Sequence, residues 1–242
     1  MSRVYLVRHG QAGTRKAYDS LSPLGRQQAR LLGRYFAEQG VRFSASWCGE
    51  MVRQQQTGDE VRAAYREAGL TFPEIKTEPS WNEFDLDDIY KALAPQLSAE
   101  DPQFRAEYEE MAAQARAAAH QHDAGVNRRW MPCDIKVFSA WLRASHPYNG
   151  QSWEAFRTRV ASGHAQLAAA DRDTDIVVFT SATPIGIFTA RTMDVTDERV
   201  MKLAGAVHNA SYTVVRVNHS DCRLHTFNAV PHLTTPELRT YR

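Results

Sequence analysis

The chain has 242 residues, 43% of them hydrophobic, which is enough to bury the core of one large domain or two small ones. Lys and Arg total 29 against 28 for Asp and Glu, so no strong net charge points to nucleic acid or an anionic membrane as the main partner. The three cysteines are far apart and form no Cys-x-x-Cys pair, which argues against a disulfide framework or a structural zinc site. The sequence shows no signal-like apolar core and no window near the roughly 18 to 20 apolar residues that span a bilayer. We therefore expect a cytoplasmic protein in a reducing compartment.

The first expected strand, around Val4–Val7, ends abruptly in Arg8-His9-Gly10. The carboxyl ends of parallel strands are where ligand crevices form, and Gly10 lets the backbone turn close to a ligand. A histidine after a strand is more often a hydrogen-bonded loop residue than a catalyst. The tripeptide by itself therefore leaves both interpretations open.

Helices and strands are expected to alternate through most of the chain. Ser22 is placed to cap the first helix, and Pro23 suits its first position. The further expected elements are a strand over residues 42–48, a helix over 50–67, a short strand over 74–77, a helix carrying Trp153 and Leu167, a strand over 176–179, a helix with Pro184 at its first position, and a hairpin over 211–217 and 223–227. From about 85 to 150 the sequence is alanine-rich and rich in mixed charges, which is typical of a helical insertion. We expect an α/β fold, a three-layer α/β/α sandwich with a mostly parallel sheet and a late antiparallel hairpin, in a single domain over 1–242 that carries this insertion.

Two further polar residues are expected near His9. Arg53 lies in the first turn of the helix over 50–67, and the handedness of βαβ crossovers brings it to the same strand-end face. Glu83 lies in a loop between aromatic residues that would exclude water from its carboxylate. Taken singly, Arg53 is a typical surface arginine and Glu83 a typical loop acid, with Asp85 close behind it.

In this order, the motifs resemble those of the histidine phosphatase superfamily, the phosphoglycerate mutase-like proteins. Arg8-His9-Gly10 is similar to the signature tripeptide of that family, and Glu83 falls where the family keeps its acid. The other similar segments are Leu21 to Ala29 at the first helix start, Arg53-Gln54-Gln55-Gln56-Thr57, Gly150-Gln151-Ser152-Trp153 with Arg159 following, and Asn209-Ala210-Ser211 before the late strand.

The resemblance implies phosphoryl transfer, and the residue types suit that chemistry. Two guanidinium groups, Arg8 and Arg53, bind charged phosphoryl oxygens through paired hydrogen bonds. A neutral His9 attacks phosphorus and carries the phosphoryl group as a covalent phosphohistidine. Glu83 gives a proton to the leaving alkoxide and then activates water as a base. The scheme needs no cofactor and no metal.

One position departs from the family pattern. The family has a second histidine after the strand that here ends at Phe179, and this histidine donates a hydrogen bond to the phosphoryl group. The corresponding residue is Ala182, whose methyl group is no donor. Loss of one such donor typically costs about 10²–10³ in rate.

Three explanations of Ala182 stay open. The two arginines, Ser181, Thr183 and the amides at the following helix start can keep enough stabilisation between them. Alternatively, His208 enters the site from the segment before the next strand. In the third explanation, the protein binds phosphorylated ligands without efficient turnover.

The sequence favours a histidine-type phosphatase acting on a small phosphomonoester, with the insertion setting the choice of substrate. A phosphoglycerate mutase-type phosphotransferase is the nearest enzymatic alternative. The resemblance implies Trp-Asn shortly after Arg-His-Gly in such mutases, whereas Gln11-Ala12-Gly13-Thr14-Arg15-Lys16 follows here. A catalytically weak phospho-ligand binding protein is the alternative from another class, because of Ala182. The expected partner is a small phosphorylated substrate, with no nucleic acid and no membrane; substrate identity and oligomeric state stay open.

Overall fold

The computed structural model describes residues 1–13, 19–118, 132–169, 173–218 and 221–241. The chain forms two compact units, one of Met1–Glu83 with Arg159–Arg242 and the other of Phe84–Thr158. The expected single domain over 1–242 stays a prediction.

A six-stranded mixed sheet organises the first unit. Its strands are β1 (Ser2–Arg8), β2 (Phe43–Cys48), β3 (Ile75–Thr77), β4 (Asp175–Thr180), β5 (Tyr212–Val217) and β6 (Cys222–Ala229), in the spatial order β3-β2-β4-β1-β5-β6. The first four in this order are parallel, whereas β5 runs antiparallel to β1 and to β6. The expected mostly parallel sheet with a late antiparallel hairpin is confirmed.

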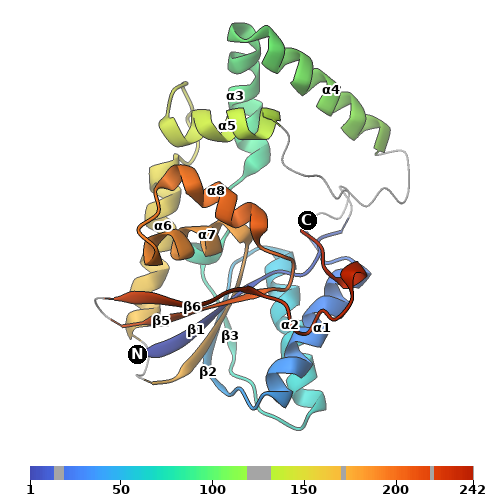
Figure 1. The fold of residues 1–242 in the computed structure, drawn as a ribbon, viewed down its shortest axis with the longest axis vertical. Helices are drawn as coiled ribbons and strands as arrows, with labels where there is room; N and C mark the ends of the chain where they lie inside the picture. Colours follow the sequence, from blue (N-terminus) through green and yellow to red (C-terminus); the bar gives the residue numbers. More distant parts are fainter. Residues whose placement is uncertain (14–18, 119–131, 170–172, 219–220, 242) are drawn as a thin grey trace. The chain divides into compact units, whose positions relative to one another are not determined.

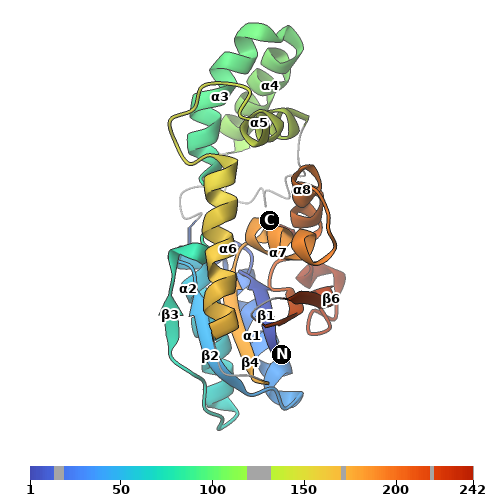
Figure 2. The same ribbon diagram turned by 90° about the vertical axis from the view of Figure 1, so that its left-hand side faces the viewer.

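Helices cover both faces of this sheet. α1 (Pro23–Glu38) and α2 (Val52–Glu67) lie on one face, while α7 (Ala182–Thr192) and the part of α6 (Trp153–Ala169) that belongs to this unit lie on the other (Figures 1 and 2). Tyr5 of β1 packs edge-to-face on Phe36 of α1, with ring centroids 5.4 Å apart, and on Phe43 of β2 at 5.3 Å. On the opposite face Trp81 packs on Phe188 of α7 at 5.5 Å. The apolar strands are thus buried from both sides, which gives the expected three layers.

The expected cap of α1 is confirmed, because the Ser22 hydroxyl accepts from the Gly25 N–H and Pro23 is the first helical residue. The expected start of α7 is wrong by two residues. The helix begins at Ala182, and Pro184 is its third residue. Proline is tolerated there because the first N–H groups of a helix have no partner within the helix. α8 (Asp197–Ala206), which packs on α7, was not expected from the sequence.

The second unit is helical in its described part. It contains α3 (Leu86–Glu100), α4 (Pro102–Ala118), α5 (Pro132–Arg143) and the start of α6. Its core is an aromatic cluster of Phe84, Phe138, Trp141, Trp153 and Phe156, in which the rings of Phe84 and Trp141 are 4.9 Å apart. Residues 119–131 of the expected insertion lie outside the described ranges. None of the helices within those ranges has the length and apolar character that crossing a membrane requires.

Candidate active site

Parallel strands of the first unit end at one edge of the sheet and bring their loops together there. Arg8 at the end of β1 pairs with Thr180 at the end of β4, and Cys48 at the end of β2 pairs with Phe179. The residues that follow these strands, including His9, therefore meet at the same edge. The first turns of α2 and α7 also lie there, because each helix begins within a few residues of a strand end.

His9 follows β1 directly and is only 6% exposed. Its ring Nδ1 lies 2.8 Å from the Gly10 carbonyl oxygen, which can only accept, so Nδ1 carries the ring proton. On the other side of the ring, Arg53 Nε lies 3.3 Å from His9 Nε2 and can only donate. These two contacts assign the tautomer: Nε2 holds a lone pair and is turned toward Arg53.

Burial and positive charge keep this imidazole neutral. Burial, followed by the charges of Arg53 and Arg8, holds the pKa of His9 well below its ordinary value of 6.5, against a smaller opposing effect of the Gly10 hydrogen bond. A neutral ring with an unprotonated Nε2 is the form that can act as a nucleophile.

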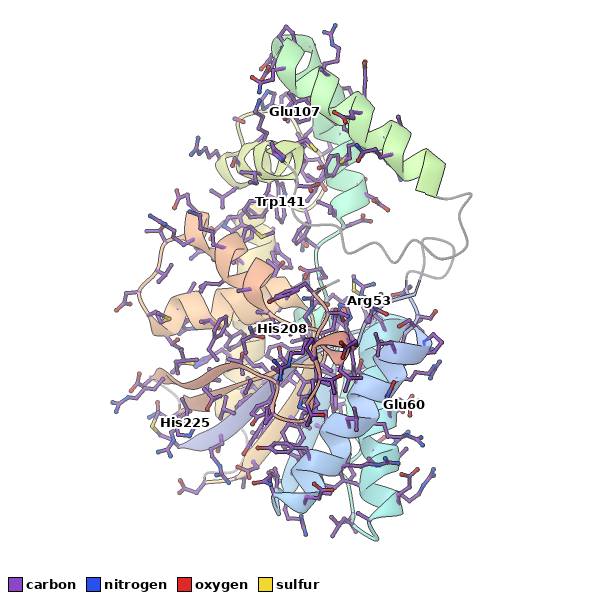
Figure 3. The ribbon with its side chains drawn as sticks, turned by 45° about the vertical axis from the view of Figure 1, so that its right-hand side comes forward. Arg53, Glu60, Glu107, Trp141, His208 and His225 are labelled. Carbon is purple, nitrogen blue, oxygen red and sulfur yellow. The ribbon has the colours of Figure 1, made fainter. Side chains whose placement is uncertain are left out.

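The two arginines come from different elements and are both buried, each at 7% exposure. Arg53 lies in the first turn of α2, where Figure 3 labels it, and its Nη1 donates to Asp19 at 3.0 Å. Arg8 is the last residue of β1, and its Nη1 donates to the Val207 carbonyl. Arg53 thus points toward His9 rather than into solvent, and the charge of Arg8 also acts on the His9 ring.

Thr57 explains the spacing of the Arg53–Thr57 motif. Its hydroxyl donates to the Arg53 carbonyl at 2.7 Å and accepts from the Gly10 N–H at 3.0 Å. The turn at Gly10 also requires glycine, because a Cβ there would overlap the Gly25 carbonyl. One helical turn of α2 therefore both carries Arg53 and holds the backbone that follows His9.

Glu83 lies after a short 3-10 helix, Pro79–Trp81, and is half-buried. Its Oε2 accepts from the Thr183 N–H at 3.1 Å, at the start of α7. Arg159 supports the loop before Glu83, because its Nη1 donates to the Asn82 carbonyl at 3.2 Å and to the Pro79 carbonyl. Burial lowers the pKa of Arg159, and the Glu83 carboxylate partly opposes this, which places the two charges close together.

Gln54 connects several elements of the site. In the sequence it is distinguished only as one residue of the Arg53–Thr57 motif. It is fully buried, and its Nε2 donates to the Trp81 carbonyl at 2.9 Å and to the Ser181 hydroxyl at 2.8 Å. The first turn of α2, the loop before Glu83 and the cap of α7 are thus held by one amide. Gln at the position after Arg53 is a polar residue on the buried side of a helix, and this was the available signal.

Ala182, where the sequence departs from the family pattern, and its two neighbours lie at the start of α7. Ser181 is its N-cap residue and Ala182 its first residue, while Thr183 gives its N–H to Glu83. Ser181 and Thr183 are buried, at 1% and 3% exposure, and Ala182 is partly exposed. That Ala182 stands in place of a second histidine stays a prediction.

Asp19 is a site residue that sequence reasoning missed. Its Oδ1 accepts from Arg53 Nη1 at 3.0 Å and its Oδ2 from the Val52 N–H, the first residue of α2, at 3.3 Å. The sequence showed only a polar loop here, and an acid in a loop carries no signal of its partner. In the described part of the chain, no group of three or more His, Cys, Asp or Glu residues is arranged to hold a metal ion.

Comparison with known proteins finds similarity in sequence and in fold. A curated relative, the serine/threonine-protein phosphatase Pgam5, mitochondrial, of Caenorhabditis elegans, is 28% identical over 93 residues. That segment is 34% of this chain and 33% of the relative, so the match spans about a third of the relative's length. Among solved structures, Bacillus stearothermophilus YhfR matches with a TM-score of 0.64 at 16% identity, over 96% of this chain and 99% of that one. A mycobacterial glucosyl-3-phosphoglycerate phosphatase matches with a TM-score of 0.57 at 21% identity, over 94% and 98%.

The structural matches, at these low identities, establish the fold. The sequence model of the histidine phosphatase superfamily (branch 1) matches residues 4–133 and 131–230, which is most of the chain. The matched region contains the residues at the strand-end edge, from Arg8 to Asn209. This chain therefore belongs to the histidine phosphatase superfamily.

Proposed function

We propose that the chain is a phosphatase that hydrolyses a small phosphomonoester through a phosphohistidine formed at Nε2 of His9. The state of the His9 ring carries the proposal. The ring is buried and neutral, and its unprotonated nitrogen faces a buried guanidinium. Phosphatase relatives and membership of the superfamily support the reaction class.

In the first half of the reaction, Arg8 and Arg53 bind the phosphoryl oxygens by charge-assisted hydrogen bonds. His9 Nε2 attacks phosphorus in line, so a P–N bond forms as the P–O bond to the leaving group breaks. Glu83, protonated, gives its proton to the leaving alkoxide. The products of this half are a phosphohistidine, a free alcohol and an ionised Glu83.

In the second half, water replaces the alcohol. Ionised Glu83 takes a proton from the water as its oxygen attacks phosphorus, and the P–N bond breaks. Inorganic phosphate leaves, and both His9 and Glu83 return to their starting forms. His9 keeps its Nδ1 proton throughout, because the Gly10 carbonyl holds it there.

The surroundings of Glu83 support its role as acid and base. The Thr183 N–H and the Arg159 charge favour the ionised form of this half-buried carboxyl group. A bound phosphate dianion has the opposite effect, because a nearby like charge favours the protonated acid. Substrate binding thus prepares Glu83 to donate, and departure of the alcohol leaves it ready to act as a base.

We propose that Ser181 and the Thr183 hydroxyl complete the phosphate site at the start of α7. The Ser181 hydroxyl accepts from Gln54 and keeps its own proton for a further hydrogen bond. Helix amino termini attract anions, because their first N–H groups point outward and the helix dipole is positive there.

Two other functions stay as candidates. The mutase-type phosphotransferase is disfavoured by the segment from Gln11 to Lys16, which lacks the Trp-Asn that the resemblance implies shortly after Arg-His-Gly. The phospho-ligand binding protein is favoured by Ala182, which removes one donor from the phosphate site. The matched proteins are named as a serine/threonine-protein phosphatase and a glucosyl-3-phosphoglycerate phosphatase, and for this chain we propose a small phosphomonoester as the substrate. Location in the cytoplasm, and independence of nucleic acid and membranes, stay predictions.

Hydrolysis of p-nitrophenyl phosphate tests the proposal. His9→Ala should lower kcat by at least about 10³-fold, because nucleophile and intermediate are both lost. His225→Ala is the matched control, since His225 is an exposed histidine of β6 that takes no part in the scheme. An unchanged rate for His9→Ala would refute the mechanism. Tight binding of orthovanadate by a wild-type chain without turnover would favour the binding protein instead.

A further inference from the structure

We propose that the His208 side chain donates a hydrogen bond from Nε2 to the phosphoryl group, in place of the hydrogen-bond donor that is missing at Ala182. The inference rests on the proposed phosphatase function and adds to it a binding residue from a different element. It concerns a hydrogen bond only, so no covalent bond forms or breaks at His208.

The segment that carries His208 is fixed against Arg8 and His9. It connects α8 to β5, and four of its hydrogen bonds go to these two residues, two to each. The groups on the segment are the Val207 and Ser211 carbonyls, the Asn209 side-chain amide at 3.3 Å and the Ala210 N–H at 3.2 Å. His208 lies within this run of contacts, one residue from the carbonyl that binds the Arg8 guanidinium.

Asn228 fixes the proton on the His208 ring. Its own orientation is certain from two backbone contacts: Oδ1 accepts from the His208 N–H at 2.8 Å and Nδ2 donates to the Ala206 carbonyl at 2.7 Å. The same Nδ2, a donor, lies 3.2 Å from His208 Nδ1. Nδ1 of the neutral ring must therefore be the acceptor, which puts the proton on Nε2. This is the opposite tautomer to that of His9.

The ring is also held in place and kept neutral. Tyr241 lies against it, with ring centroids 4.1 Å apart, and Tyr241 is itself 53% exposed. Burial lowers the pKa of His208, and the charges of Arg8 and Arg239 lower it further. At pH 7 the residue is thus a neutral donor beside Arg8.

The position of the ring in the sheet agrees with this role. Val7 pairs with Tyr212, and Tyr212 pairs with Ala229, so Asn228 and His208 lie at the strand-end edge of β1. Figure 3 labels His208 in the part of the unit that carries Arg53, with His225 further along the sheet. Since Ala182 offers no donor at the start of α7, a donor from the opposite side of Arg8 restores what the phosphate site lacks.

A matched set of variants tests the proposal by hydrolysis of p-nitrophenyl phosphate and inhibition by orthovanadate. His208→Ala should lower kcat/KM by about 10²-fold and raise the vanadate inhibition constant by a similar factor. Adding Ala182→His to His208→Ala should recover at least about tenfold of the loss, because the two positions supply the same donor. His225→Ala should stay within about twofold of wild type in both measurements.

A second pair guards against a merely structural effect. The amide nitrogen of Gln lies near the position of the imidazole Nε2, whereas that of Asn lies near Nδ1. His208→Gln should therefore keep much of the activity, and His208→Asn should be as impaired as His208→Ala.

Nitrogen-15 NMR of the histidine rings should show His208 protonated at Nε2 in wild type. In Asn228→Gly, which preserves the positive φ of 53° at that residue, this preference should be lost.

The outcomes separate this inference from the function on which it rests. If His208→Ala stays within about threefold of wild type while His9→Ala is inactive, the role of His208 is wrong and the phosphatase stands. Equal losses in His208→Gln and His208→Asn, or a proton on Nδ1, would also overturn the role of His208. If His9→Ala is fully active, the proposed mechanism itself is wrong.

Discussion

The carboxylate of Asp19 lies 3.0 Å from Nη1 of Arg53. It therefore occupies one of the two guanidinium groups that we propose to bind the phosphoryl oxygens. Its second oxygen lies 3.3 Å from the Val52 N–H at the start of α2. A carboxylate here takes two donors that suit a phosphate oxygen equally well. Asp19 and the substrate therefore compete for the same end of α2.

Asp19→Asn should tighten the binding of inorganic phosphate by about two- to fivefold, because it removes a competing negative charge whose own side chain is exposed to solvent. Titration calorimetry at low ionic strength measures this, and the gain should shrink with added salt. Asp59→Asn is the control, since Asp59 is an exposed acid of α2 that pairs with Arg62. Weaker phosphate binding in Asp19→Asn would show that Asp19 positions Arg53 rather than competing for it.

Arg159→Ala should impair the acid step more than binding. The substitution removes the guanidinium that holds the Pro79 and Asn82 carbonyls, and so loosens the loop that places Glu83. We expect kcat to fall by about tenfold with an alkyl phosphate and by about twofold with p-nitrophenyl phosphate, whose leaving group needs no proton. Glu83→Gln should show the same dependence more strongly, by about 10²-fold with the alkyl substrate.

Arg157→Ala is the matched control for Arg159→Ala, because Arg157 is an exposed arginine of the same helix that pairs with Glu154. It should leave both substrates unaffected. Equal losses of kcat with both substrates in Arg159→Ala would contradict a role through Glu83.

His232 should make the fold sensitive to acid. It is buried near the ring of Tyr35, and burial lowers its pKa from 6.5 to about 4. Between these values the unfolded chain binds a proton that the folded chain does not, so the free energy of unfolding rises with pH across this window. The contribution of His232 to the free energy of unfolding is about 3 kcal/mol, and it is complete near pH 7 and lost as the pH falls to about 4.

Urea unfolding of wild type and His232→Gln between pH 4 and 7 measures this contribution. His9, His164 and His208 also have lowered pKa values and are common to both proteins, so the difference between the two isolates His232. The variant should lose less stability on acidification than wild type. Parallel pH curves for the two proteins would contradict this role of His232.

Much of the fold could be predicted from local sequence. The Ser22-Pro23 cap and the apolar strands are encoded by neighbouring residues, and each is where the sequence places it. The sequence does not predict α8, because this helix is short. It also does not fix the first residue of α7, because Pro184 suits any position of a first helical turn. Local sequence patterns thus predict which helices and strands form better than they predict where each one begins and ends.

The site was predictable in its residue types but not in its contacts. Glu83 and Thr183 are 100 positions apart, and Arg53 and Asp19 are 34 apart, so no local pattern relates them. The protonated nitrogen of His9 also depends on which carbonyl the turn at Gly10 presents to the ring. The roles assigned to His9, Glu83, Arg8, Arg53, Ser181 and Thr183 stay predictions until they are measured.

Trapping of the covalent intermediate tests the central claim most directly. Wild-type protein mixed with a phosphomonoester and quenched in alkali within a turnover should carry a phosphoryl group that is stable in base and labile in acid. Mass spectrometry of its peptides should place that group on His9, and the signal should be absent from His9→Ala and present in His225→Ala. Turnover of the substrate with no phosphorylated His9 at any quench time would contradict the account.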